Sequence, residues 1–194
     1  MDKSYETYKE ILKSRLNEKR YYHSLCVADE AERLAIKYGG DPEKCYLAGL
    51  LHDITKNAAD EEHLQIFKSF GIMLNDIEKN AKKLWHAISG AAYIQNVLGI
   101  NDPELLDAVR YHTTAKKNMS LTAKILYLAD FTSLDRDYDD VEVIRELVDK
   151  SIEEAMIYAL KYSIVDLVEQ SKAIHFDTLE AYNEVCMGGR NGSI

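Results

Sequence analysis

Residues 47–56 read LAGLLHDITK and place an imidazole, His52, next to a carboxylate, Asp53, inside an apolar run. Burying either polar group without a partner costs several kcal/mol. The apolar run therefore predicts a packed helix, and the doublet predicts that both polar side chains find partners elsewhere in the chain.

The same two residue types recur inside other apolar, helix-like segments, as His23, His86, His112 and Asp130. Together with the doublet, they supply imidazole nitrogen and carboxylate oxygen. This is the donor set of a first-row metal site rather than of a thiolate zinc finger. A single buried histidine is usually a hydrogen-bonded core residue, but the combination favours a metal site.

Helical geometry indicates how many ions such a site would hold. Residues three and four apart share one face of a helix, whereas Asp53 follows His52 at about 100° of rotation and can reach a neighbouring position. Adjacent inward ligands suit two ions better than one. We expect the first ion to take His23, His52, Asp53 and Asp130, and the second to take Asp53, His86 and His112.

The two remaining histidines, His63 and His175, fit the ordinary interpretation. His63 follows Glu61 and Glu62 in a polar first turn, so solvent exposure or a helix contact explains it better than ligation does.

Composition and net charge limit the domain organisation, the partners and the cellular compartment that this chain can have. The 194 residues are 46% hydrophobic, which is enough for one domain, expected over 1–186 with the helices from about 140 packed on it and a disordered tail at 187–194. The net charge of -9 argues against nucleic acid and anionic membranes as partners. Three cysteines without a CxxC pair indicate a reducing compartment, and the start has no signal-peptide pattern, so we expect a cytoplasmic protein.

The positions of the prolines and of the helix-capping residues predict an all-α chain. Only two prolines occur, and each follows an aspartate, at Asp41-Pro42 and Asp102-Pro103, where the pair can cap and open a helix. The expected helices are one starting near Ser4, then about 18–38, 42–52, 60–70, 85–98, 103–112, one capped by Ser120 through Asp130, 140–171 and 177–186.

Longer strings carry a family resemblance. They are RYYHSLCVA at 20–28, LLHDITK at 50–56, WHAISG at 85–90, RYHTTAKKNMSL at 110–121, KILYLADFTSLDRD at 124–137 and AIHFDTLEAYN at 173–183. The chain resembles the HD-domain metal-dependent phosphohydrolases, and more narrowly the YqeK-type family of symmetrical diadenosine tetraphosphate hydrolases. It departs from that family at Ala115, where glycine is usual, and at Phe176, where proline is usual.

The resemblance implies an all-α, HD-domain helical bundle, a dinuclear iron centre and cleavage of the dinucleotide into two ADP. Histidine and aspartate ligands would also accept manganese, cobalt or zinc. Catalytic roles are expected for Asp53, Lys56 and Arg136. Substrate contacts are expected for Arg20, His23, Lys56, His86, His112, Thr113 and Arg136, although Arg20, Lys56, Thr113 and Arg136 are also explained by ordinary surface or capping roles.

Two alternatives stay open. One is another HD phosphohydrolase acting on (deoxy)mononucleotides or cyclic nucleotides, and the other is a nucleotide sensor without turnover. The expected partner is a dinucleoside polyphosphate or ADP. Base preference, metal identity, regulation and a possible homodimer are not determined by the sequence.

Overall fold

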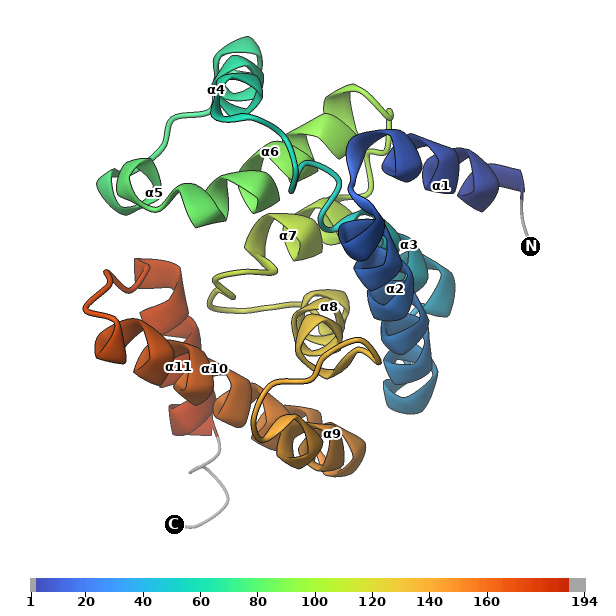
Figure 1. Ribbon diagram of the computed structural model, residues 1–194. Coiled ribbons are helices and arrows are strands. Elements are labelled where there is room, and N and C mark those ends of the chain that lie inside the picture. The colour runs from blue at the N-terminus through green and yellow to red at the C-terminus, as the bar shows by residue number, and fades with distance from the viewer. Residues whose placement is uncertain (1–2, 189–194) are drawn as a thin grey trace.

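The computed structural model describes residues 3–188, and every regular element in this range is a helix (Figure 1). This confirms the all-α prediction. None of these helices combines the length and the apolar character needed to cross a bilayer. The elements are α1 (Lys3–Arg15), α2 (Glu18–Tyr38), α3 (Pro42–Leu51), α4 (Asp60–Ser69), α5 (Asp76–Asn80), the 3-10 helix η1 (Lys82–Leu84), α6 (Trp85–Asn96), α7 (Pro103–Tyr111), α8 (Leu121–Thr132), α9 (Val141–Lys150), α10 (Ile152–Glu169) and α11 (Phe176–Gly188).

Helix α8 is the central element of the bundle. It packs against α2 and α3 on one side, α7 on another, and α9 and α10 on a third (Figure 1). Residues Ile125 to Ala129 are all buried, as expected of a helix that is covered all round. Asp130 follows directly, so one of the proposed ligands sits in the last turn of this central helix.

The two Asp-Pro pairs act as predicted. Asp41 accepts a hydrogen bond from the Lys44 backbone N–H at the start of α3, and Asp102 accepts from Glu104 and Leu105 at the start of α7. Each helix then ends at a histidine, His52 for α3 and His112 for α7.

Helices α2 and α3 pack so closely that Gly49 has no room for a side chain. A Cβ atom there would lie 2.7 Å from Ala28 Cα and 2.9 Å from Val27 O. This contact sets the distance between α2, which carries His23, and the end of α3, which carries His52.

Three expectations for secondary structure need correction. The single helix expected over 140–171 is two helices, because Ser151 is extended and its side chain accepts from Glu154 N to open α10. The segment 76–84 forms α5 and η1, which were not predicted. Helix α11 continues through Gly188, and the rest of the expected tail, 189–194, lies outside the described residues.

Candidate metal centre

The six histidines and aspartates singled out in the sequence come together in one buried cluster. His23 lies on α2, His86 on α6 and Asp130 on α8, while the other three sit at the C-terminal ends of α3 and α7. His52 is central, since its ring centre lies 5.3 Å from that of His23 and 5.0 Å from that of His112. His86 Nε2 lies 3.1 Å from His112 Nε2 and 3.2 Å from Asp53 Oδ1.

Hydrogen bonds on the outer side of the rings set the histidine tautomers. His52 Nδ1 donates to Gly49 O at 2.6 Å, and His112 Nδ1 donates to Val109 O at 2.7 Å. Because the acceptors are carbonyls, the proton of each neutral ring must be on Nδ1. Nε2 then presents a lone pair to the cluster, which is the form that binds a metal ion.

Two atoms at the centre lack the partners that burial requires. His52 Nε2 and Asp53 Oδ1 are fully buried, and neither has a hydrogen-bond partner in the described part of the chain. Lys56 Nζ, 3.5 Å from Asp53 Oδ1, offsets part of its charge, but the buried lone pair of His52 Nε2 still faces the Asp53 carboxylate, and a cation between them would satisfy both. The residues therefore fit a divalent metal ion, as the donor set also indicates.

The geometry divides the donors into two sets. His23, His52 and Asp130 form one, and His52, Asp53 and His112 form the other, with the chosen donor atoms of each set within 4.8 Å of one another. We expected Asp53 to be the shared residue, but here His52 belongs to both sets. His86 belongs to neither, although its Nε2 borders Asp53 and His112.

Burial and charge set the protonation states of the cluster. Desolvation lowers the pKa of His52 to about 3 and that of His86 to about 4, against the opposing effect of the carboxylates. Burial raises the pKa of Asp53, but the surrounding histidines and Lys56 outweigh it and hold this pKa well below its usual value. At neutral pH His52 and His86 are thus neutral and Asp53 is ionised, which are the ligating forms.

Three cationic side chains border the cluster. Arg20 Nη1 lies 3.3 Å from Asp53 Oδ2, and Lys56 Nζ lies 3.5 Å from Asp53 Oδ1 and 2.9 Å from His86 Nε2. Arg136 Nη2 pairs with Asp130 Oδ1, and its Nε donates to Asp130 O at 2.6 Å. Thr113, next to His112, has a buried Oγ1 without a hydrogen-bond partner in the described chain.

Sequence reasoning missed Asp135. Its Oδ2 accepts from His23 Nδ1 at 2.8 Å, while Oδ1 accepts from Ser133 Oγ at 2.8 Å. Its approach to His23, 112 positions away, depends on the connection between α8 and α9, which local sequence signals do not determine. A carboxylate that contacts a ligand histidine from a distant part of the chain can therefore be identified only from the tertiary structure.

The histidines outside the site are buried rather than exposed. His63 hydrogen-bonds to Ser89 Oγ at 2.7 Å, so of the two expectations for it the helix contact is correct and solvent exposure is wrong. His175 Nδ1 accepts from the Asp177 backbone N–H at 3.2 Å.

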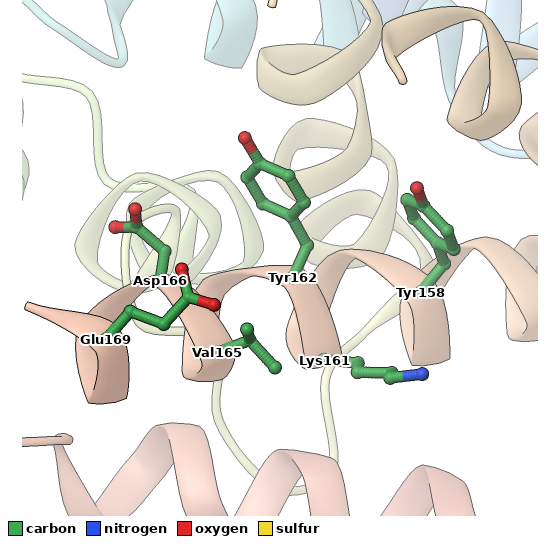
Figure 2. A pocket seen from close by; sticks show the side chains of 6 residues that line it. All are labelled: Tyr158, Lys161, Tyr162, Val165, Asp166 and Glu169. Atoms are coloured by element: carbon green, nitrogen blue, oxygen red, sulfur yellow. The ribbon is translucent and has the colours of Figure 1, made fainter. Parts of the chain in front are cut away.

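A hollow on α10 lies apart from this centre. All six residues that line it come from that one helix, with Tyr158 and Tyr162 most prominent (Figure 2). None is a predicted site residue.

A buried set of histidines and aspartates in a helical bundle is typical of the metal-dependent hydrolases of the HD class. Consistent with this, a family model described as "HD domain" matches residues 20–135. The chain is also similar to proteins named "Bis(5'-nucleosyl)-tetraphosphatase, symmetrical". It is 33% identical over 177 residues to that of Bacillus subtilis, covering 91% of this chain and 95% of the relative. It is 33% identical over 180 residues to that of Staphylococcus aureus, covering 92% of each.

A solved structure agrees with the sequence comparison. A crystal structure from Clostridium acetobutylicum, described as a predicted HD superfamily hydrolase involved in NAD metabolism, superposes with a TM-score of 0.91 at 34% identity. The match covers 94% of this chain and 97% of that one. The chain belongs to the HD domain family and, within it, to the family of the symmetrical bis(5'-nucleosyl)-tetraphosphatases.

Proposed function

We propose that this chain hydrolyses dinucleoside tetraphosphates symmetrically, releasing two nucleoside diphosphates, with a dinuclear metal centre. The observation that carries the proposal is the buried pair His52 Nε2 and Asp53 Oδ1, which have no hydrogen-bond partners among residues 3–188. The relatives named as symmetrical tetraphosphatases supply the substrate class.

The ligands of the proposed centre are His23, His52, Asp53, His86, His112 and Asp130. Bound divalent ions would supply an activated water and neutralise phosphate oxygens. Iron is the metal that the family resemblance implies, and manganese, cobalt or zinc would suit the same donors. Counting two divalent ions against two aspartates leaves a local charge of about +2, which attracts a polyphosphate to a chain of net charge -9.

The cationic residues of the chain would orient the substrate. Arg20, Lys56 and Arg136 now pair with the two aspartates of the cluster, each within reach of the same space. Once the aspartates bind metal, these cations are available to phosphate oxygens, and Arg136 offers the bidentate geometry that suits phosphate. Thr113 Oγ1 can donate to a phosphate oxygen, since it has no other partner in the described chain.

The test combines product analysis with metal analysis on purified protein. With diadenosine tetraphosphate, we expect ADP as the sole nucleotide product and about two metal atoms per chain. A mixture of AMP and ATP would mean asymmetric cleavage. Turnover of mononucleotides with an inert dinucleotide would favour another HD phosphohydrolase, and binding without hydrolysis would favour a sensor.

Two alanine variants connect the product to the site. His86→Ala and His112→Ala should each lower both metal content and turnover. His63→Ala is the matched control, because His63 is also buried but hydrogen-bonds to Ser89 outside the cluster. Circular dichroism of each variant checks that the helices are retained.

A further inference from the structure

A cavity of about 610 Å³ lies next to the proposed metal centre and has no role in the function described so far. Three separate segments line it: α5 with η1, the connection after α7, and the chain from the end of α10 to the start of α11. In Figure 1 these segments lie on the same side of the molecule. The volume is within the range of small-molecule sites, about 300–1,000 Å³.

The lining combines an apolar part with positive charge. Ile77, Leu84 and Leu167 give it an apolar surface of the kind that receives a nucleobase. Four lysines also line it, namely Lys79, Lys82, Lys83 and Lys172. Such a concentration of one sign is unexpected in a chain with net charge -9, and it favours an anionic ligand.

Two of the lysines are already ion-paired, Lys79 with Asp76 at 2.9 Å and Lys82 with Asp60. Lys172 hydrogen-bonds to the uncharged amide of Gln170. Lys83 is exposed and has neither an ion pair nor a side-chain hydrogen bond with any of the residues 3–188. It is therefore the lysine most available to a phosphate.

The cavity walls are tied together, which means that the cavity is preformed. Glu78 on α5 is buried and pairs with Arg110 on α7. Asn75 Nδ2 lies 3.1 Å from His175 Nε2, and Thr178 Oγ1 donates to Thr114 O at 2.7 Å. A preformed site spends little free energy on ordering when a ligand binds.

Thr113 connects the cavity to the metal centre. It lines the cavity, follows the proposed ligand His112 directly, and has a buried Oγ1 that no described residue meets with a hydrogen bond. A phosphate chain held at the metal centre would therefore pass this threonine on its way into the cavity.

We propose that the cavity binds one nucleoside of the dinucleotide substrate, with the base against the apolar surface and the adjoining phosphates near Lys83. This inference rests on the proposed function, which it deepens by assigning one substrate nucleoside to a site. The other nucleoside lies beyond the metal centre, outside the cavity.

Steady-state kinetics with diadenosine tetraphosphate test the proposal. Ala173→Trp should fill the cavity from its exposed rim, and Lys83→Ala should remove its unpaired charge. Each variant should raise KM by about tenfold, which corresponds to about 1.4 kcal/mol of binding, while metal content stays at the wild-type level. Val97→Trp and Lys68→Ala, at exposed positions outside the cavity, are the controls and should leave KM unchanged.

A binding experiment separates this inference from the proposed function. Irradiation with 8-azido-ADP, followed by peptide mapping, should label residues within 77–84, 113–114 or 167–178, and Ala173→Trp should suppress the label. Unchanged KM values in both cavity variants, or labelling elsewhere, would overturn the inference. A wild-type protein that labels in the cavity but does not cleave the dinucleotide would overturn the proposed function alone.

Discussion

At the scale of single residues, the cluster depends on groups that orient the histidines from outside. His52 and His112 donate Nδ1–H to a carbonyl of their own helix, while His23 donates to the carboxylate of Asp135. In each case one bond on the far side directs Nε2 inward. A carboxylate partner also makes the imidazole more basic and strengthens it as a ligand.

Asp135 therefore yields a prediction about metal binding. Asp135→Ala removes the acceptor of His23 Nδ1–H and should weaken metal affinity by about 10–100-fold, the usual effect of losing such a partner. Asp135→Asn should restore part of the affinity, because an amide oxygen can still accept the bond. A competitive chelator titration measures both. Asp137→Ala, exposed and two residues away, is the control, and equal affinity in all four proteins would contradict the prediction.

The buried His63 gives a prediction about pH. Desolvation lowers its pKa below the ordinary 6.5, so the unfolded chain takes up this proton first as the pH falls. Its contribution to stability is fully present above pH 6.5 and is lost as the pH falls from there through the folded-state pKa. His63→Asn cannot titrate. Urea unfolding should show a smaller difference in stability from wild type at about pH 5.5 than at about pH 7.5; a constant difference would contradict this.

Residue types and spacing were enough to select the members of the cluster from the sequence, because imidazoles and carboxylates inside apolar helices need partners. The sequence did not predict that Asp135 contacts His23, and it did not decide whether His63 is buried or exposed. The partners of these residues are 112 and 26 positions away. The approach of the α8–α9 connection to α2 and the packing of α4 on α6 bring them together.

At the scale of the elements, two similar helices place His52 and His112 at the centre of the cluster. Helices α3 and α7 each begin with an Asp-Pro pair and end at a histidine whose ring hydrogen-bonds to the carbonyl three residues before it. Because helix starts have strong local signals, these two were predictable. The break at Ser151 and the five-residue helix α5 were not, since neither has a proline or glycine to mark it.

The contact between α2 and α3 yields the next prediction. In Gly49→Ala the new methyl group would lie 2.7 Å from Ala28 Cα, which is backbone, so the two helices must separate. Overpacking of this kind costs about 1–3 kcal/mol. Thermal unfolding should show a lower Tm, and metal affinity should fall because His23 and His52 move apart. Gly188→Ala is the control, since a Cβ there meets nothing within 4 Å. An unchanged Tm for Gly49→Ala would contradict this packing.

At the scale of the whole molecule, the proposed metal centre joins parts of the chain that are far apart in sequence. Its ligands come from α2, the ends of α3 and α7, α6 and α8. The cluster therefore links the N-terminal helices to α6 and α7 through the central helix α8 (Figure 1). A ligand that binds there should stabilise the entire fold rather than one helix.

This linkage predicts a large thermal shift. A metal ion at about 100 times its Kd stabilises the folded state by about 2.7 kcal/mol, and for a chain of this size that raises Tm by about 5–10 °C. Adding Mn²⁺ to chelator-treated protein and scanning by calorimetry measures the shift, and excess chelator should reverse it. In His112→Ala the shift should be much smaller, because one lone pair that faces Asp53 is lost. If His112→Ala and wild type shift equally, the ions bind elsewhere, and the buried atoms of His52 and Asp53 need another partner.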